Sequence, residues 1–207
     1  MQTTQETFWQ GEFGNDYTLR NSGADMVAAN TAFFSKVLAS TAKPIQSVLE
    51  LGANRGQNLL ALRHLLPSPA VSFSAVEINP SACETLNKAM PDVTLHQGSI
   101  NSFEPTQTWD LVFTKGVLIH IAPDLLEKTY QLIDTCAKRY ILIAEYYNPQ
   151  PVSVDYRGHS NKLFKRDFAG ELLTLFPELT LLDYGFLYHR DNTFPQDDIT
   201  WFLLEKM

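Results

Sequence analysis

The sequence predicts a Rossmann-like α/β fold, in which helices cover both faces of a largely parallel sheet. Continuous apolar runs, which suit strands buried on both faces, alternate with segments whose apolar residues recur at helical spacing. The run that begins at Ser47 ends in a glycine turn, and a helical pattern follows at once. The last two apolar runs, which begin at Leu179 and Thr200, are separated only by a polar turn. This spacing predicts an antiparallel hairpin at the end of the sheet.

The remaining elements follow from the same two periodicities and from turn residues. Pro80 suits the first turn of a helix, because proline lacks the N–H that this position leaves unused. The expected helices are 24–40, 57–66, 80–90, 123–138 and 167–176, and the expected strands are 47–51, 71–78, 93–97, 110–114, 140–146, 179–187 and 200–205.

Length and charge limit the classes of function. A chain of 207 residues with 44% hydrophobic and 19% charged residues is typical of one globular domain. A net charge of −7 argues against nucleic acid or an anionic membrane as the main partner. We expect no membrane span, because no apolar run approaches ~18 residues, and a cytoplasmic protein with two free cysteines. The oligomeric state stays open.

The glycine turn predicts the cofactor. Gly52 and Gly56 place main-chain N–H groups where a nucleotide-like ligand can approach, but no Gly-Lys-Ser/Thr follows them. Glu50, just before the turn, suits a cofactor with amino and sulfonium cations better than one with a pyrophosphate. Glu77 ends the next strand, 25 positions after Gly52, where a ribose-binding carboxylate is expected. Together these residues predict an S-adenosylmethionine (SAM) site, although glycine turns and acids at strand ends also occur without a ligand.

Several motifs resemble those of the class I SAM-dependent methyltransferases. They are Glu50-Leu-Gly-Ala-Asn-Arg-Gly56, Val76-Glu-Ile-Asn79, Gln97-Gly-Ser-Ile100 and Trp109-Asp-Leu-Val-Phe-Thr-Lys-Gly116. More narrowly, the chain is similar over nearly its whole length to the methylases found beside pseudaminic acid biosynthesis genes in bacteria. That resemblance is carried by segments such as Phe8-Trp-Gln-Gly-Glu-Phe-Gly14, Ile143-Ala-Glu-Tyr-Tyr-Asn-Pro149 and Tyr156-Arg-Gly-His159.

The resemblance implies a seven-stranded class I sheet closed by the terminal hairpin, in a single domain over 1–207. Within it, 1–40 form an N-terminal cap and first helix, 45–147 the SAM-binding core, and 148–207 an acceptor lid and hairpin. Many relatives carry an acid where this chain has Ser99, whose hydroxyl can still bond adenine. The expected cofactor contacts are Arg20, Asn21, Glu50, Gly52, Asn54, Gly56, Glu77, Ile78, Ser99, Ile100, Thr114 and Lys115.

Two residues are candidate catalytic bases. His120 follows the fourth strand, and imidazole can accept a proton near neutral pH. The alternative is a packed histidine between Ile119 and Ile121. Glu145 ends the fifth strand and can act as a base if burial raises its pKa. The alternative is a rim carboxylate bonded to a loop.

The acceptor is expected to meet a basic segment in an acidic protein. Residues 152–167 concentrate positive charge, which suits a carboxylate or phosphate, although such a loop can also be merely solvated. Asp197 and Asp198 lack a convincing third ligand, so no metal is expected. Aromatic residues at 8–17 can fold over the cofactor or simply cap the core. The expected acceptor contacts are Tyr146, Tyr147, Arg157, His159, Lys165 and His189.

These observations predict an enzyme that methylates oxygen or nitrogen of a small polar, anionic acceptor. The resemblance implies a nonulosonic acid, an amino sugar or a sugar nucleotide of bacterial surface-glycan synthesis. Another carboxylate- or phosphate-bearing metabolite is the alternative acceptor, and a SAM-binding protein without turnover is the alternative class.

Overall fold

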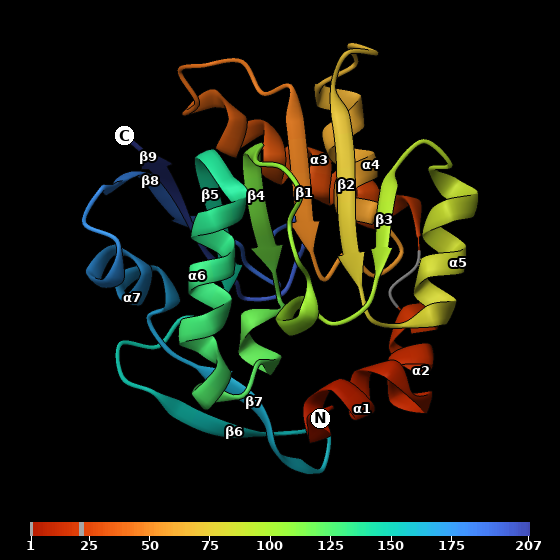
Figure 1. Cartoon of the computed structure of the whole chain (residues 1–207). Coiled ribbons are helices and arrows are strands. Elements are labelled where there is room, and N and C mark those ends of the chain that lie inside the picture. Colours follow the sequence, from red (N-terminus) through yellow and green to blue (C-terminus); the bar gives the residue numbers. More distant parts are fainter. Residues whose placement is uncertain (1, 21–22) are drawn as a thin grey trace.

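The computed structural model describes residues 2–20 and 23–207, and a seven-stranded sheet forms its centre (Figure 1). The strand order is β3-β2-β1-β4-β5-β9-β8. In that order the strands are Thr94–Gln97, Ser72–Glu77, Ser47–Leu51, Trp109–Lys115, Ala137–Glu145, Thr200–Lys206 and Leu179–Phe186.

The pairing directions confirm the predicted class. The first five strands run parallel, and β9 pairs antiparallel with both β5 and β8. The terminal hairpin therefore places its second strand inside the sheet and its first strand at the edge. Because β1 to β5 are parallel, their carboxyl ends lie along one edge, where crossover folds bind ligands.

Helices cover the two faces and bury two apolar clusters. On one face lie α3 (Ala24–Ala39), α4 (Gln57–Leu65) and α5 (Pro80–Ala89), which pack fully buried side chains such as Phe34 and Leu62 on the sheet. On the other lie α6 (Leu126–Cys136) and α7 (Phe168–Leu175). No helix in the described part of the chain is long and apolar enough to cross a membrane.

The helix expected over 123–138 differs from the structure at both ends. A 3-10 turn, Pro123–Leu125, precedes α6, and α6 already ends at Cys136. The chain enters β5 at Ala137 without a loop, so this strand starts three residues before the expected Tyr140. The expected boundary was wrong because Ala137 and Lys138 continue the helical pattern in sequence, whereas in the fold they already belong to the strand beside β4.

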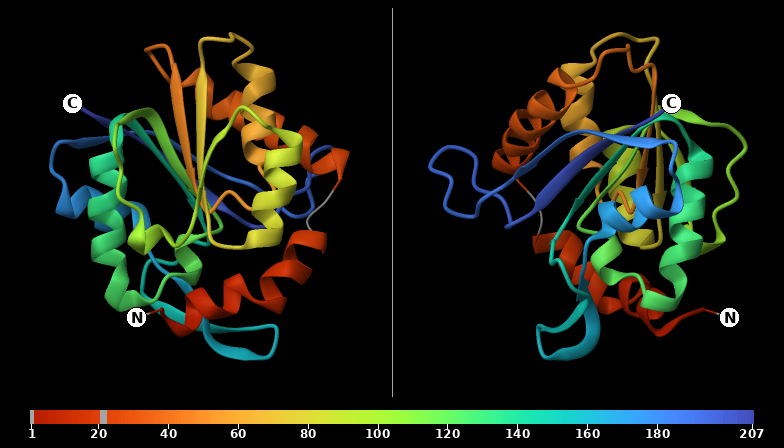
Figure 2. Two further views of the ribbon diagram at one scale, coloured as in Figure 1. Left: turned by 45° about the vertical axis from the view of Figure 1, so that its right-hand side comes forward. Right: turned by 90° about the vertical axis from the view of Figure 1, so that its left-hand side faces the viewer.

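Two units whose secondary structure the sequence did not predict lie across the carboxyl ends of the strands. One is the helix pair α1 (Thr4–Gln10) and α2 (Glu12–Arg20), and the other is the hairpin of β6 (Val152–Tyr156) and β7 (His159–Lys165). Both lie below this edge of the sheet in all three views (Figures 1 and 2).

Local chemistry explains both units. The Thr3 hydroxyl accepts from the Glu6 amide while the Glu6 carboxylate accepts from the Thr3 amide, which is a capping box that starts α1. The β6–β7 turn places Arg157 at φ 51° and Gly158 at φ 83°. Two successive residues with positive φ suit the twist of a tight hairpin.

Candidate functional site

A cavity of about 1100 Å³ opens at the carboxyl edge of the sheet. Its wall combines the segments that follow β1, β2, β3 and β4 with α1, α2, the start of α3, the β6–β7 turn and the turn over 188–198. The volume lies just above the usual range for small-molecule sites, about 300–1,000 Å³. It therefore has room for a cofactor and an acceptor together.

The glycine turn after β1 approaches the opposite wall closely. Gly52 has φ +80°, and its amide donates to the Val76 carbonyl at 2.8 Å. A Cβ at this position would lie 2.6 Å from Cγ2 of Val117. Gly56, also left-handed at φ +77°, begins α4, and a Cβ there would lie 3.0 Å from Leu86. The first glycine thus shapes the cavity and the second lets α4 pack on α5.

Glu77 joins this turn to the tip of β2. Its two carboxylate oxygens accept from the backbone amides of Asn54 and Asn79, each at 2.7 Å. Burial raises the pKa of Glu77, although these amide bonds act in the opposite direction. The side chain is 7% exposed and lies in the cavity wall beside Ile78. It therefore presents acceptor oxygens to the cavity and braces the glycine turn.

Glu50 lies behind the wall, fully buried in β1. Asn58 donates to its Oε1 at 2.6 Å, whereas Oε2 has no hydrogen-bond partner among the described residues. Burial raises the pKa of Glu50 to about 8, and Asn58 and then Lys115 oppose the rise. Burial also lowers the pKa of Lys115, which lies in the wall. A buried acceptor oxygen without a partner fits a ligand that carries an amino cation.

The wall after β3 receives a carboxylate from the N-terminal helix. The Ser99 hydroxyl donates to Oε1 of Glu6, and the Asn101 side chain donates to the same oxygen at 3.4 Å. Ile100, 8% exposed, forms the apolar surface next to them. This end of the cavity combines an apolar surface with a carboxylate.

His120 lies in the wall between two aromatic rings. Its ring is 4.5 Å from that of Trp9 and 5.2 Å from that of Tyr156, centroid to centroid. Nδ1 donates to the Lys162 carbonyl at 2.7 Å, because a carbonyl can only accept. Burial lowers the pKa of His120 to about 4, so the ring is neutral near pH 7. Nε2 therefore keeps its lone pair and can accept a proton.

Glu145 has a different position from the one expected of a base. Its oxygens accept from the backbone amides of Val117, Leu118 and Ile119, at 3.0 to 3.4 Å. Burial raises its pKa to about 7, and these amide bonds oppose the rise. Among the described residues, those that form the cavity wall do not include Glu145. This geometry favours an anchor for the 3-10 turn Leu118–His120, which carries His120 at its end.

The expected acceptor end is polar and aromatic. Tyr146 and Asp197 both line the cavity, and burial followed by this carboxylate raises the pKa of the phenol. Arg157 reaches the wall from the β6–β7 turn, with its guanidinium 5.8 Å from the Tyr156 ring. His189 reaches it from the turn before β9 and bonds Asp198 at 2.8 Å. Anion-binding and cation-binding groups therefore both face this end.

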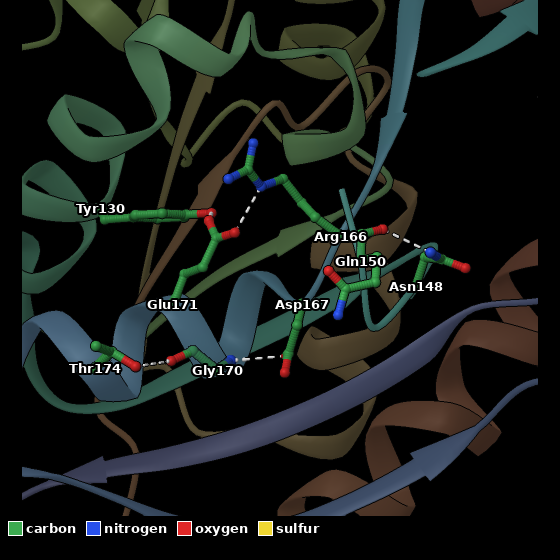
Figure 3. Close-up of polar contacts among 8 residues, drawn as sticks. All are labelled: Tyr130, Asn148, Gln150, Arg166, Asp167, Gly170, Glu171 and Thr174. Carbon is green, nitrogen blue, oxygen red and sulfur yellow. Dashed lines mark hydrogen bonds and ion pairs between the residues drawn. The ribbon is translucent and has the colours of Figure 1, made fainter. Parts of the chain in front are cut away.

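The expected basic cluster divides into members with different roles. Arg166 donates to Glu171 at 2.7 Å, and the same carboxylate accepts from Tyr130 at 2.7 Å, so Glu171 links α7 to α6 and holds this guanidinium (Figure 3). Asp167 caps α7 by accepting from the Gly170 amide at 2.8 Å (Figure 3). Lys165 instead lies over the Tyr146 ring at 5.2 Å.

The structure brings most of the expected residues to one cavity. In the wall are Gly52, Asn54, Glu77, Ile78, Ser99, Ile100, Lys115, His120, Tyr146, Arg157 and His189. Within the described part of the chain, the wall does not include Glu50, Gly56, Thr114, Glu145, Tyr147 or Lys165. Tyr147 is 41% exposed and packs near Phe202 on the side of the sheet. Asn21 and the side chains of Arg20 and His159 lie outside what is described.

The wall residues that the sequence did not assign to the site include Glu6, Asn58, Asn101 and Tyr156. The Thr3–Glu6 spacing of a capping box is a signal for α1, but it does not indicate that Glu6 meets a loop 93 positions away. Asn58 carries a weaker signal, since it is polar in the first turn of a helix that follows a ligand-type glycine turn.

Comparison with known proteins agrees with this geometry. Residues 48–139 match the family model described as a methyltransferase domain. No curated protein sequence matches the chain. Three similar solved structures show low identity over nearly complete chains.

Magnesium protoporphyrin IX methyltransferase ChlM from Synechocystis PCC 6803, with bound S-adenosylhomocysteine (SAH), has a TM-score of 0.68 and 12% identity, covering 98% of this chain and 100% of that one. DesVI from Streptomyces venezuelae has a TM-score of 0.66 and 13% identity, covering 95% and 99%. CalS10, an amino pentose methyltransferase from Micromonospora echinaspora involved in calicheamicin biosynthesis, has a TM-score of 0.63 and 11% identity, covering 94% and 96%. The family model and these structures support a SAM-dependent methyltransferase, and the chain has the class I methyltransferase fold.

Proposed function

We propose that this chain transfers the methyl group of SAM to an oxygen or nitrogen of a small polar acceptor. The observation that carries the proposal is the shared cavity: the glycine turn and Glu77 line one end, and His120, Tyr146 and Arg157 line the other. One cavity that holds both groups can align a methyl donor with its acceptor and exclude water, which is most of what methyl transfer requires.

In the half of the cavity that would hold SAM, the order of the strands suggests which part of the cofactor meets each wall segment. The Gly52 turn suits the methionine part with its amino cation, and Glu50 lies behind this part of the wall with Oε2 unpartnered. Glu77 suits the ribose hydroxyls, and Ile100 with Ser99 suits the adenine ring. Bound SAM supplies a methyl group activated by the positive sulfur. Gly56 and Thr114 serve the packing around this half rather than the ligand.

His120 is the proposed base. As the acceptor oxygen or nitrogen forms its bond to the methyl carbon and the carbon–sulfur bond breaks, the acceptor proton passes to Nε2. The Lys162 carbonyl holds the Nδ1 proton and fixes this tautomer. Glu145 holds the turn that carries His120, and we assign it to positioning.

The proposed acceptor is a nonulosonic acid, an amino sugar or a sugar nucleotide of bacterial surface-glycan synthesis. Arg157 and His189 suit its carboxylate or phosphate, and Asp197 with Tyr146 suits an amino or hydroxyl group. The similarity to CalS10, an amino pentose methyltransferase, supports a sugar acceptor. We also propose that the chain acts as one domain, with 1–40 as cap, 45–147 as cofactor core and 148–207 as lid and hairpin.

Mass spectrometry of a sugar-nucleotide and amino-sugar pool, incubated with the protein and methyl-labelled SAM, tests the proposal. The expected result is one pool member that gains a labelled methyl group while SAH accumulates. Binding of SAH without any methylated product would favour a SAM-binding protein without turnover, and product from a non-sugar acid would favour the alternative acceptor.

A further inference from the structure

Glu6 lines the cavity but belongs neither to the glycine turn nor to the acceptor end. It belongs to α1, yet its carboxylate is bonded to residues that follow β3. We propose that Glu6 recognises the adenine amino group of the cofactor, so that α1 supplies the specificity for adenine over other bases. This inference rests on the proposed function.

The position follows from the strand order at the sheet edge. The segments after β1, β2 and β3 lie side by side, because these strands are parallel neighbours and Glu77 pairs with Gln97. If the turn after β1 holds the methionine part and Glu77 the ribose, the base lies against the segment after β3. Ile100 offers the ring a surface there, and Glu6 lies in the same part of the wall.

The chemistry of the contact is that of an acceptor. Burial raises the pKa of Glu6, but hydrogen bonds from Ser99, Thr3 and Asn101 outweigh burial and lower it, so the side chain is a carboxylate near pH 7. A carboxylate only accepts hydrogen bonds. Adenine presents an amino donor at C6, whereas hypoxanthine presents a carbonyl oxygen at the same place. The carboxylate would therefore attract the first base and repel the second.

The contact can form without breaking α1. Oε2 of Glu6 accepts from the Thr3 amide at 2.7 Å, and this bond can stay when a base binds. On Oε1, the bond from Asn101 is 3.4 Å long, which makes it weak and easily replaced by the amino group of a base. The Ser99 hydroxyl meanwhile keeps the carboxylate oriented.

Calorimetric titration with SAH and with its deaminated analogue, S-inosylhomocysteine, tests the proposal. We expect the wild-type protein to bind SAH about tenfold or more tighter than the analogue, since a hydrogen bond to a charged group is being exchanged for repulsion. In Glu6→Gln the ratio of the two dissociation constants should fall toward one, because an amide can donate to the carbonyl oxygen as well as accept.

Two control variants separate recognition from folding. Thr3→Ala removes the hydroxyl that accepts from the Glu6 amide but keeps the carboxylate and its bond from the residue 3 amide, so it should weaken both ligands alike and preserve the ratio. Glu12→Gln changes an exposed acid in the first turn of α2 and should preserve both constants. If the wild-type protein binds SAH and Glu6→Gln has the same ratio of dissociation constants as the wild type, the role of Glu6 is overturned while the proposed function stands. Failure of the wild-type protein to bind SAH would overturn the proposed function and this inference with it.

Discussion

At the scale of single residues, His120 is where a proton transfer can be tested. Replacing it by asparagine should lower kcat by about 10²–10⁴, the usual contribution of a general base, and leave SAH affinity unchanged. Because burial lowers the pKa of His120 to about 4, the acid limb of the wild-type rate profile should lie near pH 4 and not near 6.5. Steady-state kinetics from pH 4 to 8 measure both effects.

The matched control is His64→Asn, at an exposed histidine in the last turn of α4. It should leave kcat and the rate profile as they are. An unchanged kcat in His120→Asn would assign the imidazole to packing between Trp9 and Tyr156.

Glu77 tests the ribose contact. Glu77→Ala removes the acceptor for the ribose hydroxyls and also the bonds to the Asn54 and Asn79 amides. We expect SAH affinity to fall about ten- to a hundredfold, as for hydrogen bonds to a charged group, and thermal stability to fall as well. Calorimetry and thermal unfolding measure the two losses. Wild-type affinity in a folded Glu77→Ala protein would remove Glu77 from the cofactor site.

Glu50 makes stability depend on pH. Its folded pKa of about 8 lies above the unfolded value of about 4.5, so between these values the native state holds a proton that the unfolded chain has released. The free energy of unfolding must then decrease as pH rises through this window. Glu50→Gln removes the titration, and the loss of stability from pH 5 to pH 8 should shrink by about 1 kcal/mol or more.

Urea unfolding at the two pH values measures this difference. Part of the pH dependence should persist in Glu50→Gln, because the pKa of Glu145 is also raised, to about 7. Equal losses in the variant and the wild-type protein would show that Glu50 is ionised in the folded state.

At the scale of elements, the β1–α4 turn requires a residue without a Cβ at position 52. Gly52→Ala combines a left-handed backbone, which costs about 1–3 kcal/mol in a strained residue, with a Cβ 2.6 Å from Val117. Gly98→Ala is the control, because no described atom lies within 4 Å of the added Cβ. Urea unfolding should show the loss in the first variant and a change within about 0.5 kcal/mol in the second.

The β6–β7 hairpin is the element that tests the acceptor. Arg157→Asn removes the charge with a residue that tolerates the observed φ of 51°, so the turn should persist. We expect the apparent KM for the acceptor to rise about tenfold, as for loss of a charged contact, while SAH affinity stays constant. Arg190→Asn, at an exposed arginine on the turn before β9, should change neither. An unaltered KM in Arg157→Asn would show that Arg157 of the hairpin does not bind the acceptor.

At the scale of the whole molecule, the sequence predicted the layers that burial determines, but not the helices and strands of the cap and lid segments that lie over them. The first strand was predicted to the residue, because β1 is an apolar run with 4 buried positions, from Val48 to Leu51. The β6 strand was missed although Val152-Ser-Val-Asp-Tyr156 alternates apolar and polar residues, because Val152 to Asp155 are exposed and the strand has no buried face in the main sheet. Glu145 was placed at the right edge of the sheet, but the three amides that bind it come from a turn 26–28 positions away.

The two units over the site, the α1–α2 pair and the β6–β7 hairpin, also touch each other. The Lys162 ammonium donates to the Thr4 carbonyl at 3.2 Å, and the rings of Phe13 and Tyr156 are 5.9 Å apart. Because both units line one cavity, a ligand that fills it must restrict both. The α1–α2 pair and the β6–β7 hairpin should therefore respond together when a ligand binds.

Hydrogen exchange followed by mass spectrometry can test that coupling. Addition of SAH should slow amide exchange in residues 4–20 and also in residues 152–165, although the cofactor half of the cavity contacts only the first of these directly. Exchange in β8, at the far edge of the sheet, should be unaffected because no residue of Leu179–Phe186 lies in the described cavity wall. Slowing confined to residues 4–20 would mean that the hairpin moves independently and closes only when an acceptor binds.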